Sequence, residues 1–163
     1  DDPVEELKTL EQYAVMEADS VELLMRLLEI YSAGSDWEKV KLVARKMLAL
    51  NPMLPSPYRF LAVAAEQTQD DQATVESLTA LARMDPLDAA DVHYRLASAL
   101  FRQQKLAKAR RQVVRALERA PRYRAAYDLL LKIVDTQAKS SLPAKLEPEA
   151  NGAGAVEAKK ESP

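Results

Sequence analysis

The stretch LALNP, residues 48–52, is the first of three related phrases that decide how this chain folds. It returns as LARMDP at residues 81–86 and as LERAP at residues 117–121. The prolines that end the three phrases lie 34 and then 35 residues apart. A period in this range is typical of stacked supersecondary units rather than of a single globular core. Such stacks usually bind partners, so the repeat predicts a class of function without naming the partner.

The composition favours a folded, helical chain. Of 163 residues, 48% are hydrophobic and 29% are charged, which is ordinary for a soluble globular protein. Ala, Leu, Glu, Lys, Arg and Gln are abundant, and these residues have high helix propensity. The chain has no Cys, which excludes disulfides, thiolate metal sites and Cys nucleophiles. No apolar stretch is long enough to span a membrane. We therefore expect a soluble protein of the cytoplasm or the periplasm, and the sequence does not decide between these compartments.

Each unit that ends in one of the three prolines contains two helical patterns. In the first unit, apolar residues at Leu24, Leu27, Leu28 and Tyr31 follow the spacing of a helix face. Capping residues are expected at Asp19, Ser35, Ser56, Asp70 and Asp88. The predicted organisation is a helix within residues 1–18, repeats at 20–53, 55–87 and 88–121, a capping helix at 122–138 and a disordered tail at 140–163.

The two ends of the array differ from the repeated units. The pattern over residues 4–16 is that of the second helix of a unit whose first helix is missing, so the chain is expected to be a piece of a longer protein. An N-terminal capping helix is the alternative. At the other end, Tyr127, Leu130, Leu131 and Val134 stand at helical spacing and predict the buried face of a terminal helix.

Small and apolar residues stand at the same offsets in every unit. The third unit shows the pattern best, with His93, Leu96, Ala97, Leu100, Ala109, Val113, Ala116 and Pro121. This register resembles the tetratricopeptide repeat family. The resemblance implies an all-α, right-handed superhelical solenoid of antiparallel helix pairs, with about three repeats plus a terminal helix at each end. The first unit departs from the pattern, since Leu28, Val40 and Met47 stand where small residues let the two helices cross closely.

The resemblance also implies a binding surface, because the first helices of such repeats line a concave groove. The family's groove offsets predict a mixed apolar and basic lining for a peptide or protein partner of unknown identity. Asp128 and Lys132 would extend this lining. The groove residues selected in this way are Met25, Glu29, Arg59, Phe60, Val63, Gln67, Tyr94, Arg95, Ser98, Phe101 and Arg102.

One kind of partner is excluded by the same offsets. Repeats that hold acidic chaperone C-termini use Lys and Asn at five groove positions. In this chain only Arg95 matches, and the other four positions are Met25, Glu29, Phe60 and Asp91. These residues cannot form a two-carboxylate clamp.

The charge is strongly polarised along the chain. Residues 1–37 carry ten acids and two bases, whereas residues 90–124 carry ten bases and two acids. Within the basic part, an exposed stripe of Lys108, Arg111, Arg115 and Arg119 could bind an anionic ligand. Nucleic acid is unlikely as that ligand, because no aromatic residues interleave with the stripe for base stacking. The other interpretation of the stripe is a solvated helix face or an electrostatic partner for the acidic end of the same or another chain.

The sequence predicts no catalytic, metal or cofactor site. His93, the single His, occupies a packing position of the repeat and is expected to be structural. Carboxylates lack the spacing of a calcium loop, and no Gly-rich phosphate loop is present.

Three functions remain open. The first is a non-catalytic scaffold that binds a partner in the concave groove. The second is a C-terminal accessory array of a larger, possibly bacterial, enzyme. The third is anionic-ligand or nucleic-acid binding through the basic third repeat. The oligomeric state is not predicted.

Overall fold

A computed structural model describes residues 3–17 and 19–141 of the chain. This part of the chain consists of helices joined by short turns, and the predicted tail at 140–163 lies outside it except for its first two residues. The helices are α1 (Pro3–Met16), α2 (Val21–Ala33), α3 (Trp37–Leu50), α4 (Pro55–Gln67), α5 (Asp71–Arg83), α6 (Ala89–Arg102), α7 (Leu106–Arg119) and α8 (Arg124–Ser141).

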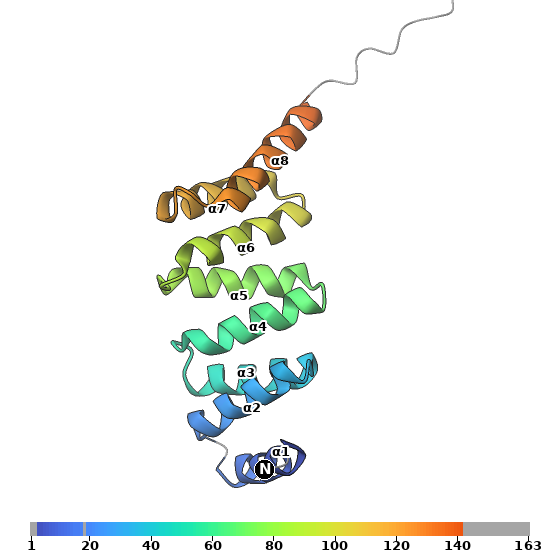
Figure 1. The fold of residues 1–163 in the computed structure, drawn as a ribbon, viewed down its shortest axis with the longest axis vertical. Coiled ribbons are helices and arrows are strands. Elements are labelled where there is room, and N and C mark those ends of the chain that lie inside the picture. Colours follow the sequence, from blue (N-terminus) through green and yellow to red (C-terminus); the bar gives the residue numbers. More distant parts are fainter. Residues whose placement is uncertain (1–2, 18, 142–163) are drawn as a thin grey trace, which may run out of the picture.

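The helices stack one above another in an elongated column, from α1 at one end to α8 at the other (Figure 1). Three antiparallel pairs form its middle: α2 with α3, α4 with α5, and α6 with α7. The first helix α2 contacts the next first helix α4, and α6 contacts α8. Among the described residues, the second helices α3, α5 and α7 make no such contact with one another. Within this part of the chain, first helices therefore contact one another at α2 with α4 and at α6 with α8, but not at α4 with α6.

The same turn joins the two helices of every pair. Its second residue takes a left-handed backbone conformation: Ser35 has φ 59°, Gln69 has φ 56° and Gln104 has φ 58°. The next residue donates its amide to a carbonyl five residues earlier, as Asp36 does to Tyr31 and Lys105 does to Leu100. Such a turn satisfies carbonyl groups left open at the helix end. The periodicity of the sequence is thus reproduced in the backbone.

Two predicted helix caps are displaced by one residue. The side chains of Ser20 and Asp36, rather than those of Asp19 and Ser35, accept from the backbone of α2 and α3. Ser35 is unavailable because it forms the left-handed residue of the turn. Asp70 caps α5 as predicted, through the amide of Ala73 at 3.0 Å.

The remaining two predicted caps, Ser56 and Asp88, make no side-chain cap bond. Helix α4 begins one residue before Ser56, at Pro55, and Leu54 stands at its cap position without a side-chain bond. Asp88 holds the cap position of α6, but its carboxylate is bound by Arg59 instead.

The core runs along the column as two neighbouring clusters that meet at α4. The cluster of the N-terminal half includes Leu24, Leu28 and Met47, and that of the C-terminal half includes Leu78 and Leu96. The small residues predicted at the helix crossings of the second and third units, Ala62, Ala97, Ala109 and Ala116, are fully buried. The bulky residues Leu28, Val40 and Met47 of the first unit are fully buried as well, so the repeat register holds there despite the larger side chains.

Helix α8 buries a different face from the one predicted. The buried residues are Ala126, Leu129 and Ile133, whereas Tyr127, Leu131 and Val134 are exposed and only Leu130 is partly covered. The physical reason is that α8 packs on α7 and α6 alone. The predicted face is the one that a first helix turns toward its own second helix, and the described residues contain no such helix after α8.

Helix α1 covers the other end of the column. It packs Leu7, Leu10 and Ala14 against the N-terminal core. Tyr31 donates to Glu11 at 2.6 Å, and this bond, with that from Lys39, lowers the pKa of the Glu11 carboxyl. In Figure 1 α1 is foreshortened whereas α2 to α7 lie across the view, so its axis is inclined to theirs.

Candidate partner-binding groove

The predicted groove residues lie on the first helices of the three pairs. Met25 and Glu29 come from α2, Arg59 to Gln67 from α4, and Tyr94 to Arg102 from α6. All eleven are half-buried or exposed, so solvent can reach each of them. Phe60 packs against the N-terminal core, and Tyr94 and Phe101 pack against the C-terminal core. The first helices therefore present aromatic rings that are anchored in the core on one side and open on the other.

Arg95 is held in place by a carboxylate of the preceding unit. Its Nε and one terminal nitrogen donate to the two oxygens of Glu66 at 3.0 and 2.7 Å. The side chains of Arg95 and Glu66 are only 23% and 29% exposed. The hydrogen bonds to Glu66 raise the pKa of the Arg95 guanidinium. Two parallel bonds between planar groups fix orientation as well as charge, so Arg95 is a rigid part of the groove wall.

The other two predicted groove arginines are paired in the same way. Arg59 donates to both oxygens of Asp88, which lowers the pKa of that carboxyl. Arg102 donates to Asp71 at 2.6 Å. Each bond joins a first helix to the neighbouring unit. The basic part of the expected mixed apolar and basic lining is therefore corrected: Arg59, Arg95 and Arg102 are paired with carboxylates of the chain itself, so the predicted lining is apolar and ion-paired.

The third unit contributes a pocket of about 680 Å³ to this surface. Four predicted residues line it, namely Tyr94, Arg95, Ser98 and Arg102. The ring of Tyr94 lies 5.0 Å from the ring of Tyr123, measured between centroids. Tyr123 in turn donates to Asp91 at 3.1 Å, and burial together with that carboxylate raises the pKa of the Tyr123 hydroxyl to about 12. One side of the pocket is thus the ring of Tyr94, which Tyr123 supports from behind the lining, and the other is a set of paired charges.

Three further residues of this pocket were not predicted: Glu66, Gln69 and Asp71. They were missed because they lie at the end of α4, in the turn to α5 and at the start of α5, outside the groove offsets of the family. A signal does exist in the sequence. Arg59 pairs with Asp88 and Arg95 pairs with Glu66, and in both pairs the opposite charges are 29 residues apart. A recurring spacing of opposite charges close to the length of the repeat indicates contacts between neighbouring units.

The predicted anion-binding stripe lies on α7, where all four of its side chains are exposed. Arg119 is already paired within the chain, because its guanidinium donates to the carboxylate of Asp85 at 2.7 Å. Lys108, Arg111 and Arg115 form no ion pair with any described residue.

His93 lies between α6 and α7 and is 8% exposed. Its Nδ1 is 2.9 Å from the side-chain oxygen of Gln112. Within residues 3–17 and 19–141, no three His, Asp or Glu side chains gather as a metal site would require. None of the helices in that part of the chain is long and apolar enough to cross a membrane.

Comparison with known proteins finds relatives in structure only. No family model matches the chain, and neither does any curated protein. Among solved structures, MamA superposes with a TM-score of 0.72 at 17% identity, over 81% of this chain and 77% of that chain. The Yersinia enterocolitica type III secretion chaperone SycD, solved with a peptide of the translocator YopD, gives a TM-score of 0.63 at 17% identity, over 73% and 95% of the two chains.

A third similar structure is the first tetratricopeptide repeat domain of Spaghetti (RPAP3), bound to the HSP90 peptide SRMEEVD. Its TM-score is 0.62 at 20% identity, over 71% of this chain and 91% of that chain. The predicted all-α tetratricopeptide-like solenoid is therefore confirmed. At these identities the likeness establishes the fold alone.

Proposed function

We propose that this chain, which has the tetratricopeptide repeat fold, is a non-catalytic protein-interaction module that binds a peptide or protein partner along its first helices. One observation carries the proposal. Phe60 on α4 and Tyr94 and Phe101 on α6 stay partly open to solvent, and Tyr94 lines a pocket of about 680 Å³. Rigid aromatic groups beside fixed polar groups are the usual anchors of a protein interface. SycD and RPAP3, which share the fold, were solved with bound peptides.

The paired charges indicate the chemistry of the partner. Arg59, Arg95 and Arg102 already have carboxylate partners, so an acidic ligand would have to displace those carboxylates before it could bind. Such a ligand gains little net electrostatic energy. We therefore infer a partner segment that is mainly apolar and uncharged, with a side chain that enters the pocket beside Tyr94 and Ser98.

A selection from a library of displayed peptides tests this proposal. Peptides enriched on the purified chain should be apolar, and their binding should be lost when Ser98→Arg fills the pocket and Tyr94→Ala removes its aromatic wall. Glu76→Ala with Arg83→Ala is the matched control, because both side chains are exposed on the second helix α5. Equal binding of the enriched peptides by the groove variant and the control variant would show that the first helices are not the binding surface.

A further inference from the structure

Helix α8 occupies the position of a first helix in a fourth unit. Tyr127 donates its hydroxyl to the carbonyl of Pro121 at 3.1 Å, just as Tyr58 donates to Pro52 at 3.2 Å at the start of the second unit. The two tyrosines stand at the same place in the repeat, and each closes the loop that follows the proline. The repeat register therefore continues into α8 in three dimensions as well as in the sequence.

The side of α8 that would meet a second helix is open. Leu131 is 64% exposed, whereas its equivalents Leu28, Ala62 and Ala97 are 0% exposed. Val134 is 43% exposed, whereas its equivalent Leu100 is 5% exposed. In the first three units a second helix covers these positions. Comparison among the units thus identifies this face as one built to be covered by a helix.

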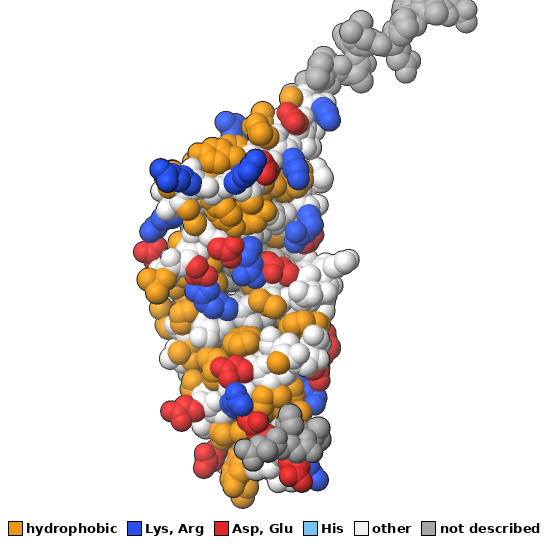
Figure 2. Space-filling model, viewed as in Figure 1, with side chains coloured by type: hydrophobic (Ala, Val, Ile, Leu, Met, Phe, Trp, Pro, Cys, Tyr) orange, Lys and Arg blue, Asp and Glu red, His pale blue; other side chains and the backbone are white. Residues whose placement is uncertain are grey.

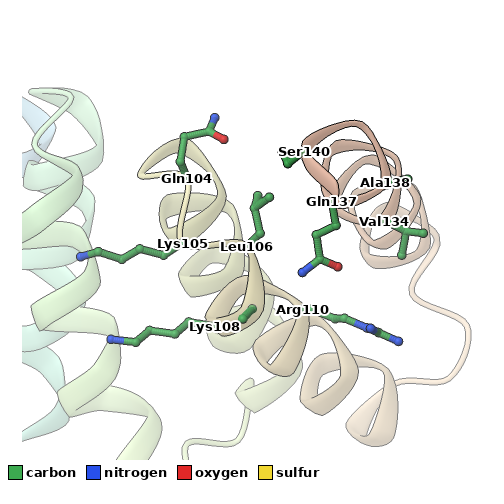
Figure 3. Close-up of a pocket in the computed structure, with 10 residues that line it drawn as sticks. Gln104, Lys105, Leu106, Lys108, Arg110, Val134, Gln137, Ala138 and Ser140 are labelled. Atoms are coloured by element: carbon green, nitrogen blue, oxygen red, sulfur yellow. The ribbon is translucent and has the colours of Figure 1, made fainter. Parts of the chain in front are cut away.

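The open face borders a long hollow through Val134, with α7 as the other wall, and Leu131 lies one turn earlier on the same side of α8. A pocket of about 840 Å³ lies between the start of α7 and the end of α8. Leu106 of α7 and Val134 and Gln137 of α8 line it, and Gln137 lies on the side of α8 nearer to Leu106 (Figure 3). A second pocket of about 540 Å³ continues along α7 past Ala107 and Val114. We call these two pockets together the terminal groove. Its length along α7 and its apolar floor suit an amphipathic helix.

The rim of the terminal groove is basic. Three side chains of this rim form no ion pair with any described residue, in contrast to the paired arginines of the first helices. Glu118 is the acid that lines the groove. Residues 104–124 carry eight bases and one acid. The three unpaired side chains are Arg110, Arg111 and Arg115, whereas Lys105 and Lys108, which also line the first pocket, extend away from α8 (Figure 3).

The opposite end of the chain is acidic and exposes apolar side chains, so it complements the basic rim and apolar floor of the terminal groove. Residues 1–22 carry eight acids and one base. In the space-filling view, Asp and Glu side chains are frequent near the α1 end, whereas Lys and Arg side chains gather near the α8 end (Figure 2). On α1, Tyr13 and Met16 are 53% and 82% exposed. In the repeat register Tyr13 corresponds to Met47, which is fully buried against its first helix.

We propose that α1 of a second copy docks in the terminal groove of the first, so that copies of this chain associate head to tail. The α1 end supplies the apolar Tyr13 and Met16 together with Glu5 and Glu17, which form no ion pair with any described residue, whereas Glu6 and Glu11 are paired with Arg26 and Lys39. The groove supplies an apolar floor and a basic rim. Residues 142–163 are a poorer occupant, because they contain three prolines and only three large apolar residues, which is too few for the apolar face of a helix. The contact joins two different surfaces, so it need not close and can extend to a third copy.

Sedimentation velocity of the 163-residue chain over a range of concentrations tests the proposal. The weight-average mass should rise with concentration at low salt, and the rise should weaken about tenfold or more at high salt, because the pairing relies on exposed charges. Tyr13→Lys with Met16→Lys blocks the helix, and Leu131→Glu with Val134→Glu blocks the groove. All four residues are exposed, so both variants should keep the wild-type circular dichroism. Leu87→Glu, at another fully exposed Leu away from both ends, is the matched control and should associate like the wild type.

Mixing the two blocked variants distinguishes head-to-tail contact from every other arrangement. Each variant alone should stay monomeric, and association should return on mixing, because one variant keeps an intact helix and the other an intact groove. A wild-type chain that is monomeric at all concentrations overturns the proposal and leaves the terminal groove to a different partner. A blocked variant that still associates alone overturns it too, because the contact would then join two like surfaces.

Discussion

The bond between Arg95 and Glu66 offers a quantitative test of how the units are joined. Replacing Glu66 with Ala removes two charge-assisted hydrogen bonds of 3.0 and 2.7 Å, made between side chains that are less than a third exposed. Fully exposed pairs contribute up to about 1 kcal/mol, and breaking a buried pair costs about 3–5 kcal/mol. Arg95 keeps Asp91 at 3.8 Å, which compensates part of the loss. We expect Glu66→Ala to lower the free energy of unfolding by about 1–2 kcal/mol.

A double-mutant cycle in urea isolates the pair from the other effects of each substitution. Arg95→Ala and the double variant complete the cycle, and the coupling energy should be about 1 kcal/mol. The pair of Arg102 with Asp71 is the control, because Arg102 is 51% exposed and its coupling should be smaller. A coupling energy near zero for Arg95 with Glu66 would refute the reasoning. In that case the carboxylates would not neutralise the groove arginines, and the predicted preference for apolar partners would lose its basis.

Three further predictions follow from the fold. Ile133→Ala should lower the free energy of unfolding, measured in urea, by about 2–5 kcal/mol because Ile133 is fully buried. Leu131→Ala should lower it by less than about 0.5 kcal/mol because Leu131 is exposed. Equal losses for the two variants would contradict the buried face of α8 seen in the structure. Gln69→Gly should raise the free energy of unfolding by about 0.5–1 kcal/mol, because φ is 56° at this residue and glycine adopts this conformation without strain. A lower free energy of unfolding would show that the contacts of the Gln69 side chain contribute more stability than relief of the backbone strain. The pKa of Asp88 is lowered by the hydrogen bond from Arg59, so the stability that this group contributes is present above its unfolded value of 3.8 and is lost as the pH falls through the folded pKa. The difference in unfolding free energy between wild type and Asp88→Asn should therefore be below about 1 kcal/mol at neutral pH, since the pair is partly exposed, and should shrink in acid; a difference that grows in acid would contradict the pairing.

Much of the groove could be predicted from the sequence, but its electrostatic character could not. The register placed Tyr94, Ser98 and Phe101 on α6, because helical spacing within one unit is a local property of the chain. It did not reveal that Glu66 and Asp88 would neutralise the groove arginines. Those contacts cross between units, and their existence depends on the distance between neighbouring helices.

The sequence by itself determined the period, the helix pairs and the positions buried within each unit, because a helix and its apolar face follow from residues three and four apart. The tertiary structure decided which surface each end of the column leaves open. Helix α8 carries the pattern of a first helix, yet it buries Ala126, Leu129 and Ile133 because burial requires a neighbour, and α6 and α7 are the neighbours it has. The phrases that end in Pro52, Pro86 and Pro121 thus specify the unit. The packing between units specifies the charge of the concave groove and the terminal groove at α8.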